Sequence, residues 1–120
     1  MLQGRKEFAR QLRELGYEPI LLGGNRLKFQ YLVGGGRFKG SEILLGFEVP
    51  PTFSRNPPSG PHVSPRLLPL NPLANCHPDK VLKSDFGEEW EYWSRPYPGW
   101  RGREPVETYL GFIARLFETS

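Results

Sequence analysis

The sequence predicts an α+β fold in a single domain that spans residues 1–120. Three observations favour it: helical spacing of apolar residues near each end of the chain, alternation of apolar residues between them, and a composition that suits one core. A chain of 120 residues, 38% of them hydrophobic, has the size of one ordinary domain. The expected order is an N-terminal helix, an antiparallel meander of three to four strands, a long proline-rich irregular segment and a C-terminal helix.

An apolar stripe that ends at a glycine predicts the first helix. Phe8, Leu12 and Leu15 recur at positions i, i+4 and i+7, and charged residues fill the positions between them. Gly16 follows the last apolar position, where a glycine commonly ends a helix.

Two alternating segments then predict neighbouring strands. The alternating apolar residues are Leu27, Phe29, Tyr31 and Val33 in the first segment, and Ile43, Leu45, Phe47 and Val49 in the second. The glycines at 34–36 predict a hairpin turn between them, since a phosphate-binding loop would need a strand before it and a helix after it. A short apolar run over residues 19–22 adds a further candidate strand.

Residues 50–72 contain eight of the thirteen prolines. Because proline fixes φ and favours extended geometry in the residue before it, we expect residues 50–58 to be stiff and extended. Apolar residues between the prolines predict that the segment is ordered against the core, with a strand near Val63 to Leu70. Residues 71–88 show no apolar period and predict a polar loop.

An aromatic block and the second helix complete the chain. At least one of Trp90 and Trp93 is expected in the core, while Glu88, Glu89 and Glu91 are expected to form a solvated face. Pro105 stands where the first residue of a helix would be. Apolar residues follow it at helical spacing: Val106, Tyr109, Leu110, Ile113, Leu116 and Phe117.

Composition excludes some classes of protein. The net charge of +3 comes from scattered lysines and arginines, so nucleic-acid binding is not indicated. A single cysteine, Cys76, excludes an internal disulfide and suits a reducing compartment. No apolar run has the length of a signal-peptide core or of a membrane span. We therefore expect a cytoplasmic protein with no nucleic-acid or membrane partner.

Three motifs resemble those of ubiquitin-conjugating (E2) enzymes. A strand runs into prolines, with Phe53 four positions before the Pro57-Pro58 pair. His77-Pro78-Asp79 resembles the His-Pro-Asn motif that precedes the catalytic cysteine of those enzymes, and Trp93-Ser94-Arg95-Pro96 resembles the Trp-Ser-Pro motif that follows it. More narrowly, residues 57–62 and 87–96 resemble the bacterial proteins called prokaryotic E2 family E.

The resemblance implies an E2-like fold and an acyltransferase without a cofactor. The operons of that family imply a ubiquitin-like protein, an E1-like activating enzyme and a protein target as partners, and a role in antiphage defence. The nucleophile's position falls near Ser84 or Asp85, where there is no cysteine, whereas Cys76 precedes the His-Pro-Asp motif. Two acceptors therefore stay open, an oxyester on Ser84 or a thioester on Cys76, with His77 and Asp79 as further catalytic candidates. Aromatic and motif residues are candidates for partner binding: Phe53, Trp93, Ser94, Tyr97 and Trp100.

A serine nucleophile needs a positioned base, and His77, His62 and Asp85 are the candidates. His62 lies between Pro61 and Val63, where we expect it to satisfy a backbone group. Cys76, His77 and Asp79 lack the paired spacing of a zinc site, so no metal is predicted. The alternative to an enzyme is a catalytically silent E2 variant that binds a modifier or organises a complex. A small basic adaptor for nucleic acids or proline motifs is a third and weaker hypothesis.

Overall fold

The computed structural model describes residues 4–58, 60–67, 76–77, 81–93, 100–102 and 104–119. The described residues form two helices and one antiparallel sheet, which confirms the α+β class. The elements in chain order are α1 (Gly4–Glu14), β1 (Ile20–Leu21), β2 (Arg26–Leu32), β3 (Glu42–Glu48), β4 (His62–Ser64), β5 (Cys76–His77), β6 (Val81–Lys83), β7 (Glu91–Trp93) and α2 (Val106–Glu118).

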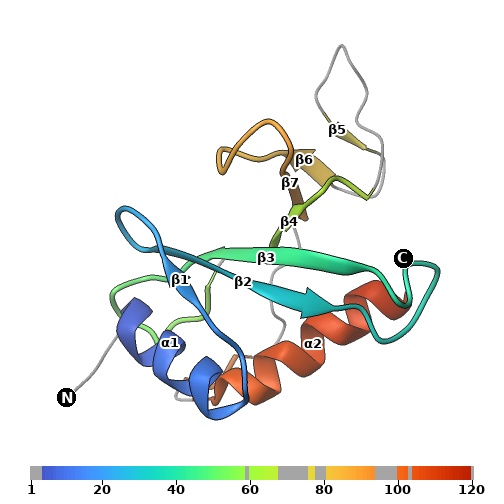
Figure 1. The fold of residues 1–120 in the computed structure, drawn as a ribbon. Helices are drawn as coiled ribbons and strands as arrows, with labels where there is room; N and C mark the ends of the chain where they lie inside the picture. Colours follow the sequence, from blue (N-terminus) through green and yellow to red (C-terminus); the bar gives the residue numbers. More distant parts are fainter. Residues whose placement is uncertain are drawn as a thin grey trace.

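The sheet has the strand order β1-β2-β3-β4-β7-β6-β5. The first four strands follow one another as a meander, and Leu45 of β3 pairs with Phe29 of β2 and with Val63 of β4. The chain then reverses its direction across the sheet, so that β7 lies beside β4 and β5 forms the far edge. In Figure 1 both helices lie on the same side of β2 and β3, and β5 to β7 lie beyond β4.

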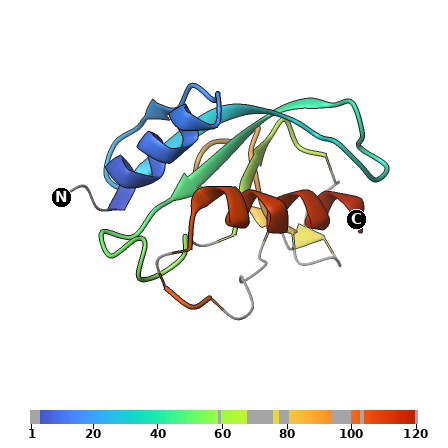
Figure 2. The ribbon, with the colours of Figure 1, turned by 90° about the horizontal axis from the view of Figure 1, so that it is seen from below.

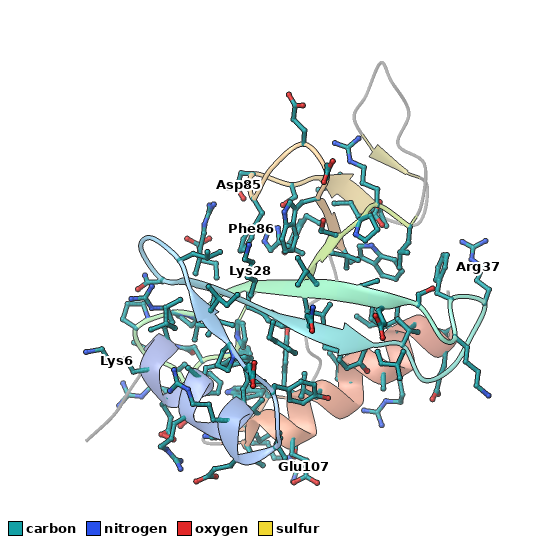
Figure 3. All side chains as sticks on the ribbon, in the orientation of Figure 1. Lys6, Lys28, Arg37, Asp85, Phe86 and Glu107 are labelled. Atoms are coloured by element: carbon teal, nitrogen blue, oxygen red, sulfur yellow. The ribbon has the colours of Figure 1, made fainter. Side chains whose placement is uncertain are left out.

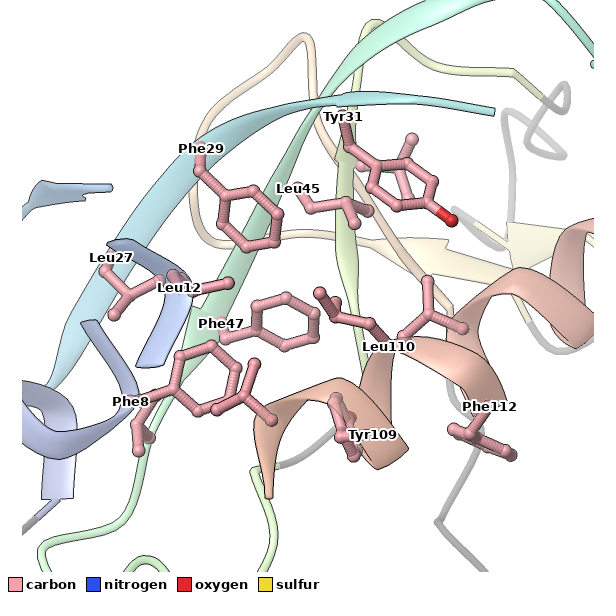
Figure 4. Packing of buried hydrophobic residues seen from close by; sticks show 14 of the residues in the cluster. Phe8, Leu12, Leu27, Phe29, Tyr31, Leu45, Phe47, Tyr109, Leu110 and Phe112 are labelled. Atoms are coloured by element: carbon pink, nitrogen blue, oxygen red, sulfur yellow. The ribbon is translucent and has the colours of Figure 1, made fainter. Parts of the chain in front are cut away.

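The main core lies between the helices and one face of the sheet. In Figure 4, Phe8 of α1, Phe47 of β3 and Tyr109 of α2 meet between the layers, and the Phe47 ring centroid is 5.5 Å from Phe8 and 5.6 Å from Tyr109. Burial of each such side chain contributes about 1.5–3 kcal/mol. The alternating residues predicted for the two central strands are all buried, namely Leu27, Phe29, Tyr31, Val33, Ile43, Leu45, Phe47 and Val49.

In Figure 2 the two helices lie on the same face of the sheet. A side chain of α1 also bonds the start of α2. Pro105 was expected to be the first residue of α2, but it is the N-cap, so the helix begins one position later, at Val106. The proline gives no side-chain cap. The backbone N–H of Val106 instead donates to Gln11 Oε1 of α1 at 2.7 Å. The apolar stripe of α1 ends at Leu12, because Leu15 is 40% exposed and Gly16 turns the chain with φ 95°.

Three expectations about the middle of the chain are corrected. Residues 51–55 form turns, closed by bonds such as Phe53 N–H to Pro50 O at 2.9 Å, since the φ of proline suits turns as well as extended chain. The strand expected near Val63 to Leu70 is β4, which ends at Ser64; residues 68–70 lie outside the described part of the chain. Residues 71–88 are not all loop, because β5 and β6 pair there. Strands of two or three residues are too short to show a period.

Candidate functional site

The face of the sheet opposite the helices carries a polar pair beneath aromatic rings. His62 pairs with Gly46 on one side and with Tyr92 on the other, so these three residues share that face. Val63 and Glu91, which also pair, face the helices. Figure 3 shows Phe86 on the side of the sheet away from α2.

His62 and Ser84 are joined by a hydrogen bond. The distance from His62 Nδ1 to Ser84 Oγ is 2.6 Å, and the two residues are 6% and 3% exposed. Ser84 directly follows β6, and the pairing of β6 with β7 and of β7 with β4 brings it to His62. The backbone N–H of Phe86 donates to Ser84 Oγ at 3.0 Å. The hydroxyl can therefore accept from Phe86 and donate its own proton to a neutral His62.

Aromatic rings cover His62. The His62 ring is stacked on Phe86, with centroids 4.1 Å apart, and it also contacts Tyr92 at 4.7 Å. Phe86 in turn packs on Trp90 at 5.2 Å. Gly46 makes room for this packing, because a Cβ there would lie 2.5 Å from Phe86 Cε2. The absence of a side chain at Gly46 thus lets the Phe86 ring approach the sheet.

Burial dominates the electrostatics of His62. Desolvation lowers the pKa of His62 from 6.5 to about 4; Arg26 adds to the fall and Asp85 opposes it. The imidazole is therefore neutral at pH 7 and can accept a proton from Ser84. A general base works best with a pKa near the working pH, so His62 is a weak base while it is covered.

An ion pair lies beside the aromatic cover. Arg26 Nη2 is 2.6 Å from Asp85 Oδ2, and Arg26 Nη1 donates to the backbone oxygen of Asp85 at 3.3 Å. The guanidinium carbon of Arg26 is 4.8 Å from the centroid of the Phe86 ring, which is a cation–π contact. A residue of β2 thus holds two successive residues of the segment that covers Ser84.

The structure assigns different partners to the candidate bases. His62 is bonded to Ser84, rather than to the backbone group that we expected, and the Asp85 carboxylate is bonded to Arg26. Cys76 and His77 form the edge strand β5, opposite Leu82 and Val81. Asp79 lies outside the described residues, as do Ser94 and Tyr97.

The described aromatic candidates for partner binding are core or half-buried residues, and Trp93 lies in the core, as expected for at least one of Trp90 and Trp93. Phe53 is 1% exposed and Trp93 is 0% exposed, because both rings pack among other aromatic side chains. Trp100 is half-buried against the core, and its indole N–H donates to the backbone oxygens of Ser54 and Arg55 at 3.2 and 3.0 Å. Phe53 and Trp100 hold the turns after β3 against the core, and Trp93 packs the sheet against Phe117 of α2.

Glu91 is fully buried, which corrects the expectation of a solvated acidic face. Glu88 and Glu89 are exposed, but the Glu91 carboxylate accepts hydrogen bonds from the backbone N–H of Leu67 at 2.8 Å and from Trp93 Nε1 at 3.0 Å. Alternation with period two in a strand puts Glu91 on the same face as Trp93, and that spacing is the signal that could have found it.

Protein-family models, curated proteins and solved structures were each compared with the chain, and none matches it. Within the described ranges, no three histidine, cysteine, aspartate or glutamate residues are grouped so that they could hold a metal ion. None of the helices in the described part of the chain has the length and apolar character needed to cross a membrane.

Proposed function

We propose that this chain is an E2-like transfer protein that receives a ubiquitin-like modifier from an E1-like enzyme and passes it to a protein target. The hydrogen bond between His62 Nδ1 and Ser84 Oγ carries the proposal. A serine hydroxyl becomes a useful nucleophile when a base is positioned to take its proton. The order of the sequence motifs supports the same residue, since Ser84 lies between His77-Pro78-Asp79 and Trp93-Ser94.

The reaction is an acyl exchange. The C-terminal acyl carbon of the modifier gives up its bond to the activating enzyme and forms a bond to Ser84 Oγ, while the serine proton passes through His62 to the departing group. An amine of the target then attacks the oxyester, and the proton lost by the amine returns to the oxygen of Ser84. Cys76 is the alternative acceptor, through a thioester.

The test is formation of the adduct with activating enzyme, modifier and ATP. We expect an adduct that resists thiols but is cleaved by hydroxylamine, that disappears in Ser84→Ala and that survives in Cys76→Ala. Ser41→Ala, on the β2–β3 connection, is the matched control and should form the adduct normally. An adduct that thiols cleave and that Cys76→Ala abolishes would move the acceptor to Cys76. No adduct with an active E1-like enzyme would refute the transfer function.

A second candidate function is a silent E2-like binding module. The observation that favours it is the 3% exposure of Ser84, whose partner His62 is stacked on Phe86. In that case the His62–Ser84 bond only satisfies two buried polar groups. Calorimetry with the modifier separates the two functions when it is paired with the adduct assay, because binding without an adduct supports the silent module.

A further inference from the structure

Ser84 cannot react in this arrangement, because an acyl carbon cannot reach its buried oxygen. Ser84 is 3% exposed and Phe86 stacks on the His62 ring to which it is bonded. Residues 85–90, which we name the cover loop, connect Ser84 to β7. If Ser84 is the acceptor, the cover loop must move before the transfer begins.

The contacts of the cover loop differ along its length. At its start, Arg26 binds the carboxylate and the backbone oxygen of Asp85 and lies over the Phe86 ring. At its end, Arg66 Nε donates to the backbone oxygen of Trp90 at 3.2 Å. The first group of contacts acts directly on the ring that covers His62, whereas Arg66 holds the backbone of Trp90, whose ring packs on Phe86 with centroids 5.2 Å apart. Arg26 is 59 positions from Asp85 and belongs to β2, so it joins the loop to a distant part of the chain.

The exposure of the two charged side chains shows which one is fixed. The Asp85 side chain is 70% exposed, so burial does not hold its carboxylate in place. The Arg26 side chain is 27% exposed, and its strand pairs along its full length with β3. Arg26 is therefore the anchored side chain. Asp85 and Phe86 of the cover loop are the residues that can be released from it.

We infer that Arg26 is a positioning residue that latches the cover loop over Ser84, and that release of this latch exposes the acceptor. The inference rests on the proposed function of Ser84, but the latch itself can be measured without any partner. An exposed ion pair and an exposed cation–π contact are each weak. Loss of both should raise the population of the open loop by about 3- to 30-fold.

The test measures access to residue 84 in the full chain. Cys76→Ala with Ser84→Cys gives a protein whose one thiol is at position 84, and its rate of alkylation by iodoacetamide is followed by mass spectrometry. Addition of Arg26→Met keeps an apolar stem but removes the guanidinium, and it should speed alkylation about 3- to 30-fold. The matched control is Arg37→Met, because Arg37 lies over the Phe38 ring at 4.9 Å, away from this site. The control should leave the rate unchanged.

Equal alkylation rates in the parent and in Arg26→Met would overturn the latch, and so would an equal rise in Arg37→Met. If the Ser84→Cys protein does not fold, His77→Gln leaves His62 as the single histidine of the two in the chain. Its modification by diethylpyrocarbonate should then be faster when Arg26→Met is added.

The labelling experiment and the adduct assay test the two proposals separately. Faster labelling without any adduct refutes the transfer function alone. An adduct with unchanged labelling refutes the latch alone.

Discussion

The Nδ1 atom of His62 lies 2.6 Å from the Oγ atom of Ser84, although 22 positions separate the two residues in the chain. The strand order β4-β7-β6 creates this contact, because β7 lies between the strand that begins with His62 and the strand that ends just before Ser84. Both groups are buried, so the contact gives His62 Nδ1 a partner and gives the Ser84 hydroxyl an acceptor for its proton.

Burial of neutral His62 predicts a loss of stability in mild acid. In the unfolded chain the pKa of His62 is near 6.5, whereas in the folded protein it is about 4. Between these values the unfolded state binds more protons, so the free energy of unfolding is fully retained above pH 6.5 and falls as the pH drops toward 4. The total loss is about 3 kcal/mol. Urea unfolding, followed by tryptophan fluorescence from pH 7 to pH 4.5, measures it.

The variant His62→Gln serves as the comparison, because every other titratable group is present in both proteins. Arg26 and Asp85 shift the His62 pKa, and Tyr92 and Lys28 lie on the same face of the sheet. Only the wild type loses stability through His62, so the difference in unfolding free energy between the wild type and His62→Gln should shrink as the pH falls. A constant difference across this range would show that His62 titrates normally.

Removal of the buried carboxylate of Glu91 should destabilise the protein strongly. Glu91→Ala leaves the backbone N–H of Leu67 and the indole N–H of Trp93 without this acceptor, and each unsatisfied buried donor costs about 1–3 kcal/mol. We therefore expect a loss of about 2–6 kcal/mol in urea unfolding. Glu89→Ala removes an exposed carboxylate from the adjacent loop and should change stability by less than about 0.5 kcal/mol. Similar losses in the two variants would contradict the buried role of Glu91.

A methyl group at position 46 should displace Phe86 from His62. The Cβ of Gly46→Ala would lie 2.5 Å from Phe86 Cε2, closer than atoms can pack, so the ring must shift. His62 then gains water, and its pKa, measured by NMR titration, should rise from about 4 toward 6.5. Gly111→Ala in α2 is the control, since a Cβ there meets nothing within 4 Å and the His62 pKa should stay unchanged. A His62 pKa that stays near 4 in Gly46→Ala would show that Phe86 does not set it.

Much of the fold could be predicted because its signals are local. Phe29 and Phe47 lie on strands long enough to alternate visibly, and Phe8 and Tyr109 lie on helical stripes, so their burial follows from period alone. The short strands β5 and β6 gave no such signal and were expected to be loop.

The candidate site was predicted only in part. Ser84 was singled out by its place between two motifs, and His62 was one of three candidate bases; their catalytic roles stay predictions. Arg26 and Phe86 were not foreseen, because the contact between residue 26 and residues 85–86 crosses 59 positions of the chain and no periodicity records it.

By itself, the sequence determined the class of the fold, the two helices and the faces of the central strands, because residues 3.6 or 2 positions apart share a face whatever the rest of the chain does. Only the tertiary structure decided which polar groups are buried together. The return of β7 to the side of β4 puts His62 beneath Phe86 and beside Ser84, and it turns Glu91 into the core. A polar residue's environment depends on the strands beside it, and those neighbours come from distant parts of the chain.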